Sequence, residues 1–150
     1  MARLELHLLS MDAHERWSEL VDVVGRQLLI IDPEEDTERF ASLKLRLAVT
    51  RESQLDNPQG AITAYQEILD LQPEHAQARM GLEAYLESED HKLEAARILE
   101  PIYEQVQDWP QLIIVHEIQL EASDEQMRRV DLLMRIGELY SKRLGDAENA

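Results

Sequence analysis

The stretch Ala61–Leu86, AITAYQEILDLQPEHAQARMGLEAYL, contains two apolar stripes separated by Pro73. Apolar residues that recur every three or four positions lie on one face of a helix. A proline inside such a pattern ends the helix, because it has no backbone N–H and its ring blocks the preceding turn. The stretch therefore predicts two amphipathic helices joined by a short turn. Their apolar positions are Ala61, Ala64, Tyr65, Ile68 and Leu69, then Ala78, Leu82, Tyr85 and Leu86.

The same spacing continues along most of the chain and favours an all-α protein of about seven helices, with a partial helix at each end. Asp56-Asn57-Pro58 and Asp108-Trp109-Pro110 are typical helix starts, since a capping side chain precedes a first-turn proline. Asp124-Glu125 places acidic residues at the start of a helix predicted over 126–143. The last stripe comprises Leu132, Leu133, Ile136, Leu139 and Tyr140.

Part of the chain is duplicated. RWSELVDVVGRQL (Arg16–Leu28) aligns with DWPQLIIVHEIQL (Asp108–Leu120), so that Trp17 and Leu20 match Trp109 and Leu112, 92 residues later. Beyond the following loop the alignment continues 89 residues apart, so that two helices and the start of a third recur in order. The distance from one copy to the next spans five helices. The alignment pairs Leu43 with Leu132, Leu47 with Ile136, Leu55 with Leu144, and Ala61 with Ala150. A shorter period of 34 residues relates Ala61, Tyr65 and Ile68 to Ala95, Leu99 and Ile102.

The composition excludes several classes of function. The 150 residues carry a net charge of −16 and no cysteine, so neither a disulfide framework nor a thiolate site is expected. No third of the chain is basic, which argues against nucleic acid and anionic membrane surfaces as partners. No apolar run approaches the roughly 18 residues of a membrane span, and the first residues lack the pattern of a signal peptide.

Residues 57–88 resemble the tetratricopeptide repeat, which runs from a small residue and an aromatic through L-x-L-x-P into A-x-A. The flanking helices resemble divergent arrays of bacterial tetratricopeptide proteins. The resemblance implies antiparallel helix pairs stacked in a right-handed superhelix, an α-solenoid, over a single domain of residues 1–150 that is a fragment of a longer array. The expected structural repeat positions are Trp17, Leu20, Ala61, Tyr65, Pro73, Ala78, Leu82, Tyr85, Ala95, Trp109 and Leu112.

The sequence departs from the family at several points. Arg79 stands where the family often has a bulky aromatic, and Glu83 stands where it often has glycine. The span of five helices is an odd number, which strict two-helix alternation does not produce. Pro101 is expected to kink or split its helix, because the carbonyl of Arg97 loses its donor. Which helices line a concave face is therefore left open.

The search for chemistry predicts no catalytic, metal-binding or cofactor-binding residue. No two of the five histidines have His-x-x-x-His spacing, and His116-Glu117 point in different directions on a helix. Acidic runs such as 34–36 and 87–90 are interpreted as solvated caps, and the glycines are isolated. The two tryptophans are interpreted as packing residues rather than ligand-stacking ones.

The predicted function is a non-catalytic scaffold that binds another protein or peptide. An acidic surface would favour a basic partner, and a location in the cytoplasm is expected. Some tetratricopeptide domains are peptide clamps that hold a terminal carboxylate with basic residues, and Arg79 and Arg97 are the only candidates for such a role here. Self-association through exposed array ends is a further possibility. The alternative is a helical regulatory or catalytic segment of a larger enzyme.

The two ends of the chain suggest a cut through an array. In LYSKRLGDAENA the residues LGD are expected to close one helix and Ala147 to begin another, so that 146–150 would be frayed or docked without support. The matching stretch LDNPQGA leads directly into ITAYQEIL, which favours this interpretation. At the other end RLELHLLS is predicted to be part of a helix whose partner is missing.

Overall fold

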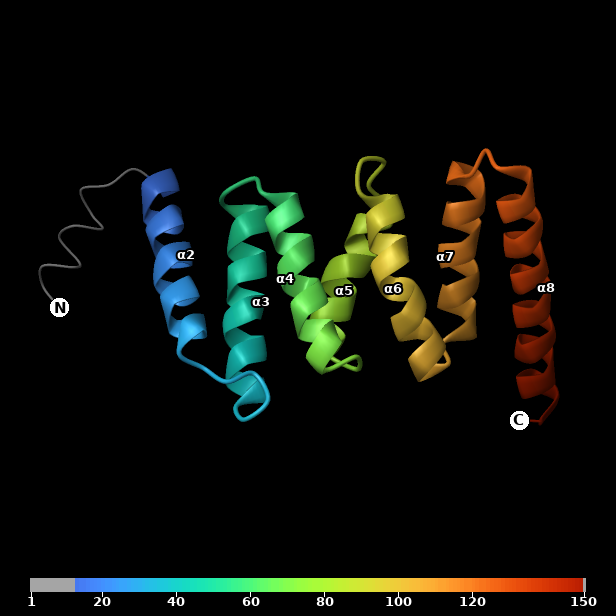
Figure 1. Cartoon of the computed structure of the whole chain (residues 1–150), viewed down its shortest axis with the longest axis horizontal. Coiled ribbons are helices and arrows are strands. Elements are labelled where there is room, and N and C mark those ends of the chain that lie inside the picture. Colours follow the sequence, from blue (N-terminus) through green and yellow to red (C-terminus); the bar gives the residue numbers. More distant parts are fainter. Residues whose placement is uncertain (1–12, 150) are drawn as a thin grey trace, which may run out of the picture. The chain divides into compact units, whose positions relative to one another are not determined.

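The structure, a computed structural model, describes the backbone of residues 13–149 and the side chains of residues 13–143. Seven α-helices and no strand lie in this range (Figure 1), which confirms the all-α prediction. The helix predicted over RLELHLLS lies outside the described residues. The helices are α2 (Ala13–Leu29), α3 (Thr37–Ser53), α4 (Pro58–Leu71), α5 (Ala76–Tyr85), α6 (Lys92–Val106), α7 (Trp109–Ala122) and α8 (Gln126–Asn149).

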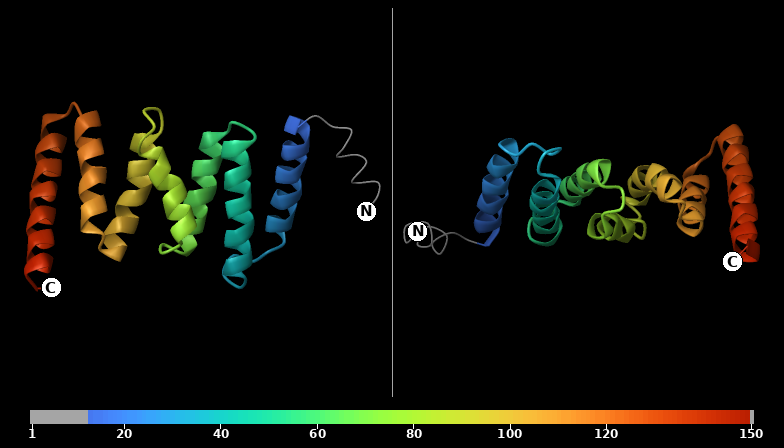
Figure 2. Two further views of the ribbon diagram at one scale, coloured as in Figure 1. Left: turned by 180° about the vertical axis from the view of Figure 1, so that it is seen from behind. Right: turned by 90° about the horizontal axis from the view of Figure 1, so that it is seen from below.

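The chain divides into two compact units, residues 1–72 and 73–150, where the sequence analysis expects one domain. Unit 1 contains α2, α3 and α4, and unit 2 contains α5 to α8. Within each unit, helices that follow one another in sequence run in opposite directions and lie side by side (Figure 2). The duplicated segments are α2–α3 in unit 1 and α7–α8 in unit 2, and each forms an antiparallel pair in contact.

Small residues let α3 and α4 pack closely in unit 1. Ala48, Ala61 and Ala64 are completely buried, and a methyl group at these positions allows two helix backbones to approach. The connection is equally tight. Asp56 adopts φ of 48°, a left-handed conformation that aspartate tolerates better than most residues. Asn57 then caps α4 by accepting a hydrogen bond from the backbone N–H of Gly60 at 3.0 Å.

The core of unit 2 is built from large side chains of α5, α6, α7 and α8. Pro101 lies on an exposed position of α6 and the helix continues through it to Val106. The expected splitting of this helix is therefore wrong, since the exposed ring does not interrupt the buried face. The α6 helix instead ends at Gln107, whose φ of 58° is a left-handed cap. Completely buried members of the core are Leu82, Leu99, Tyr103, Val115 and Leu132.

The predicted helix starts are confirmed at α4, α7 and α8. Asp108 accepts a hydrogen bond from the backbone N–H of Gln111 at 3.4 Å, and α8 begins directly after Asp124-Glu125. The end of α8 differs from the prediction, because the helix runs through residues 144–146 to Asn149. In the matching segment, Pro58 follows the cap residue and prevents α3 from continuing. Ala147 stands at that position of the duplicate and permits the helix, while Ala150 lies outside the described residues.

Candidate functional site

The predicted repeat positions occupy the packed parts of both units. Six of them are at most 2% exposed: Ala61, Tyr65, Ala78, Leu82, Ala95 and Leu112. The other five are half-buried: Trp17, Leu20, Pro73, Tyr85 and Trp109. The Lys142 ammonium lies 4.7 Å from the centre of the Trp109 ring. Trp109 thus connects α7 with α8 by a cation–π contact.

The two arginines predicted to bind a partner lie in different surroundings within unit 2. The Arg79 guanidinium lies 3.8 Å from the Glu83 carboxylate one turn later on α5. Arg97 on α6 lines a cleft of 320 Å³ together with Arg128, Asp124 and Glu125. Arg79 is not among the residues that line this cleft, so the cleft does not join the two arginines into a clamp.

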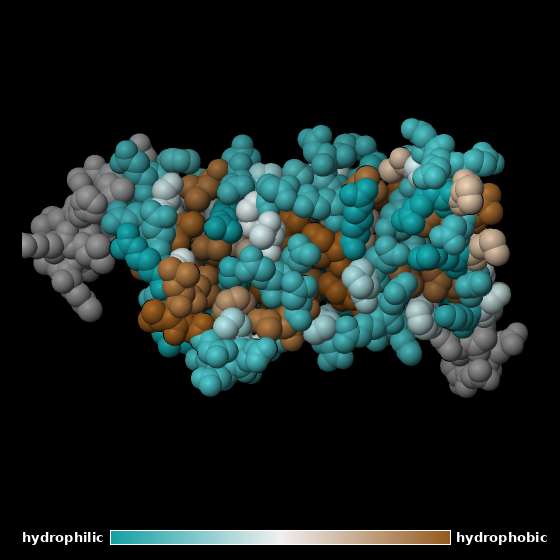
Figure 3. All heavy atoms as spheres, viewed as in Figure 1, coloured by the Kyte–Doolittle hydropathy of each residue, from teal (hydrophilic) through white to brown (hydrophobic). Residues whose placement is uncertain are grey.

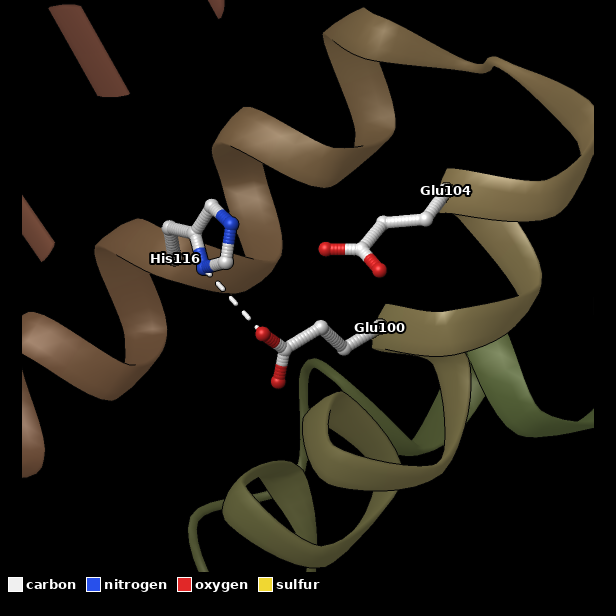
Figure 4. Close-up of side chains that lie close together, drawn as sticks. All are labelled: Glu100, Glu104 and His116. Atoms are coloured by element: carbon white, nitrogen blue, oxygen red, sulfur yellow. Dashed lines mark ion pairs between the residues drawn. The ribbon is translucent and has the colours of Figure 1, made fainter. Parts of the chain in front are cut away.

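The structure brings together three residues that the sequence analysis did not connect. Glu100 and Glu104 lie one turn apart on α6 and face His116 of α7, with possible ligand atoms of all three within 4.8 Å of one another (Figure 4). His116 is 1% exposed. The only signal in the sequence is the spacing of the two glutamates, which places them on one face of a helix. Their approach to His116 depends on the antiparallel packing of α6 on α7.

Gln119 determines which nitrogen of His116 carries the proton. Its amide nitrogen donates to Glu100 Oε2 at 2.9 Å, and its amide oxygen lies 3.0 Å from His116 Nδ1. A carboxylate only accepts hydrogen bonds, so the amide oxygen must be the atom that faces His116, and Nδ1 must donate to it. The other ring nitrogen, Nε2, lies on the side where the Glu104 carboxylate points toward the imidazole (Figure 4).

The cluster has the donor types of a zinc site, because Zn²⁺ takes imidazole nitrogen and carboxylate oxygen. The Glu100 carboxylate is already engaged, however. Its Oε1 atom lies 3.5 Å from the Arg135 guanidinium of α8, which also pairs with Asp131 at 3.2 Å. Since the Arg135 guanidinium balances the charge of Glu100, we interpret the cluster as a polar connection between α6, α7 and α8.

Replacing Glu100 with alanine is expected to destabilise the protein by about 1–3 kcal/mol, because the Gln119 amide would lose its acceptor in a nearly dry site. Glu104→Ala is the matched control, one turn away, since the side chain of Glu104 is exposed and has no hydrogen bond or ion pair within the described region. Its effect is expected to stay within about 0.5 kcal/mol. Urea unfolding checks both values.

Thermal melts of the original chain, Glu100→Ala and Glu104→Ala, each with and without ZnCl₂, test the interpretation of the cluster as a polar connection. Zinc is expected to leave the melting temperature unchanged. A rise in melting temperature that both glutamate variants abolish would contradict this and identify a metal site, because a ligand that binds only the folded state stabilises it.

A cleft of 530 Å³ adjoins the cluster and is lined by residues of α6, α7 and α8. It has an aromatic wall at Trp109, and both charge signs are present around it. The lining consists of Glu104, Trp109, Leu112, His116, Arg135, Glu138, Leu139 and Lys142.

The outward face of α8 carries an exposed apolar stripe. Leu132 and Leu139 of the predicted stripe are buried, as expected, but Leu133 is 54% exposed and Tyr140 is 46% exposed. Gly137 lies between them, and a Cβ atom built there would meet nothing within 4 Å. Apolar side chains are visible over α8 at the right-hand edge of the molecule (Figure 3). We call this surface the α8 outer face: Met127, Val130, Leu133, Met134, Gly137 and Tyr140.

Comparisons with known proteins do not assign the chain to a family, since neither a family model, a curated protein nor a solved structure matches it. Among the described helices, none has the length and apolar character that a membrane span requires.

Proposed function

We propose that this chain is a non-catalytic scaffold that binds another protein through the α8 outer face. The observation that carries the proposal is the exposure of five large apolar side chains along this one helix face, at 46–81% of their surface. Scattered single apolar residues are normal on a protein surface, whereas a continuous row marks an interaction site.

The proposed architecture is a tetratricopeptide-like solenoid of antiparallel helix pairs with a right-handed superhelical twist. Its support is the resemblance of residues 57–88, the recurrence of the α2–α3 pattern in α7–α8, and the buried alanines where helices pack closely. Solenoids of this kind present side surfaces and ends on which partner segments dock. A cytoplasmic location remains a prediction from the sequence.

The net charge of −16 favours a partner with basic residues around its apolar contact. Charge of this kind accelerates association and makes it dependent on ionic strength. The apolar centre would supply most of the affinity, because the outer face itself has no charged residue among its six members. Binding is therefore expected to weaken at high salt without being abolished.

The second candidate function is a regulatory or catalytic segment of a larger enzyme. The observation that favours it is the convergence of Glu100, Glu104 and His116 at the edge of the cleft. The zinc melts described above distinguish the two candidates, since the scaffold proposal requires no bound ion.

A displayed library of random peptides, selected on the full chain and counter-selected on its Val130→Glu variant, tests the scaffold proposal. Enriched peptides are expected to bind the original chain and to lose at least tenfold in affinity on the variant, because a carboxylate buried in an apolar contact is costly. The Arg128→Glu variant is the control, as Arg128 is exposed on α8 outside the outer face. The proposal would be refuted if none of the enriched peptides lost affinity on the Val130→Glu variant.

A further inference from the structure

The internal duplication provides a counterpart on α3 for four positions of the α8 outer face: Val130, Leu133, Gly137 and Tyr140. In α3, the segment that matches α8, the face toward α4 includes Ala41 and Ala48, which are 3% and 0% exposed. Lys44 on the same face forms an ion pair with Glu67 of α4. The Arg51 guanidinium donates to the backbone carbonyl of Gly60 at 3.1 Å. This face of α3 is therefore the α4 contact.

The duplicate positions, 89 residues later, are the exposed ones of α8. Ala41 corresponds to Val130, Lys44 to Leu133, Ala48 to Gly137 and Arg51 to Tyr140. Val130 is 47% exposed, whereas Ala41 is buried. The two helices thus match in register and each has a small residue at the centre, Ala48 or Gly137, but only α3 has a helix covering this face within the described residues.

Gly137, like Gly25 of α2, is a glycine inside a helix with open space beside it, so packing among the described residues does not require a glycine there. A glycine in a helix interior costs about 1 kcal/mol relative to alanine, and the open space beside Gly137 would accept a side chain without any clash. Its counterpart Ala48 is 0% exposed, on the face of α3 that also carries Lys44, which pairs with Glu67 of α4. A missing side chain is useful where another backbone passes close to the helix.

We propose that the α8 outer face binds an amphipathic helix of a partner protein, antiparallel to α8, in the way that α4 packs on α3. This inference rests on the proposed scaffold function and specifies the kind of partner. Small residues of the partner helix lie opposite Gly137. The model for this arrangement is α4, which carries Gly60 and Ala64 and faces Ala48 and Arg51 of α3.

The chemistry of the partner follows from a position that is charged in α3 and apolar in α8. Lys44 of α3 pairs with Glu67, and Leu133 stands at the matching position of α8. A carboxylate opposite Leu133 would be desolvated without a cation. The partner helix therefore carries an apolar residue where α4 has Glu67, and otherwise keeps the small-residue stripe of α4.

The probe is a synthetic peptide with the sequence of residues 57–72 in which Glu67 is replaced with leucine. Isolated helices of this length are marginal in water. A lactam bridge between a Gln66→Lys substitution and Asp70 therefore holds the helix, since both positions are exposed on α4. A second peptide, with Ala64→Glu in addition, keeps the bridge but blocks the small-residue stripe. Fluorescence anisotropy of labelled peptide measures binding to the full chain.

The full chain is expected to bind the first peptide at least tenfold more tightly than the second. The Gly137→Leu variant should lose at least tenfold in affinity for the first peptide while its melting temperature stays the same or rises, since glycine is the poorer helix former. Arg128→Glu should bind like the original chain. Unchanged binding by Gly137→Leu, or equal binding of both peptides, would overturn the inference.

The display selection separates failure of this inference from failure of the scaffold proposal. Enriched peptides that depend on Val130 but are extended or lack a small-residue stripe would overturn the helix-partner inference and leave the scaffold proposal intact. Sedimentation of the chain alone tests whether a second copy of the chain occupies the face. A dimer that Val130→Glu dissociates would show that a second copy of the chain fills the face, which also overturns the inference, whereas a monomer supports it.

Discussion

Replacing Leu99 with alanine is expected to lower the free energy of unfolding of unit 2 by about 2–5 kcal/mol, a large fraction of a small domain's stability. Leu99 is completely buried on α6, and α6 packs on α5 and on α7. Two neighbouring helices cannot both move inward to fill the space of the lost methyl groups. The loss of stability therefore has two parts: the free energy of burying the deleted apolar atoms, and the cost of the cavity that remains.

The two tryptophans allow this effect to be measured in the unit where it occurs. Trp17 lies in unit 1 and Trp109 in unit 2, so in a Trp17→Phe background the fluorescence reports on unit 2 alone. Leu133→Ala is the matched control, because the same substitution at a 54% exposed position should cost less than about 1 kcal/mol. Similar losses at both positions would show that α6 is not packed as described.

Raising the pH above 10 is expected to destabilise the protein through Tyr103. This side chain is completely buried on α6 and its hydroxyl donates to Glu83 Oε1 of α5 at 2.7 Å. Burial, followed by the hydrogen bond to Glu83, raises the pKa of Tyr103 far above its ordinary value of 10.0. Both causes act against the ionised phenolate, which would lose its hydration and its donor role beside a carboxylate.

The sign of the pH effect follows from the protons bound in each state. Above pH 10 the unfolded chain releases the Tyr103 proton while the folded chain keeps it, so the folded state binds more protons and stability falls as pH rises. The slope from this group approaches about 1.4 kcal/mol per pH unit. Below the ordinary pKa both states hold the proton, and the contribution of Tyr103 is constant.

Urea unfolding of the original chain and of Tyr103→Phe between pH 8 and pH 11.5 isolates this contribution, because the other tyrosines titrate in both proteins. At pH 8 the variant should be less stable by about 1 kcal/mol through loss of the hydrogen bond to Glu83. The difference should shrink and then reverse as the pH passes 10. Parallel stability curves across the whole range would contradict the assignment of the raised pKa to Tyr103.

Local signals in the sequence predicted most of the helices correctly. Asn57 and Pro58 define the start of α4, because a cap and a first-turn proline act on the residues beside them. Where a local signal was absent, the prediction failed. The LGD sequence near residue 145 was expected to end α8, but glycine and aspartate only weaken a helix, and no proline follows to stop it.

The candidate site was much less predictable. The contact of Glu100 with Gln119 and Arg135 joins three helices, so its parts are distant in the sequence. The spacing of Glu100 and Glu104 indicated a common face but not what that face meets. The sequence predicts Arg79 and Arg97 as members of a clamp, and that role stays a prediction. In the structure Arg79 lies 3.8 Å from Glu83 of its own helix, and Arg97 lines a cleft that does not include Arg79.

The sequence by itself determined the helical class, the helix starts and the duplication, because periodicity and capping act within a few residues. Only the tertiary structure decided which apolar positions are core and which are surface. Leu132 and Leu133 are adjacent in one stripe, but Leu132 packs in the core of unit 2 and Leu133 faces outward. A helix face is buried only where another helix lies against it. Within the described residues a helix covers this face of α3 but not the matching face of α8, whose Leu133 and Tyr140 stand where α3 has Lys44 and Arg51.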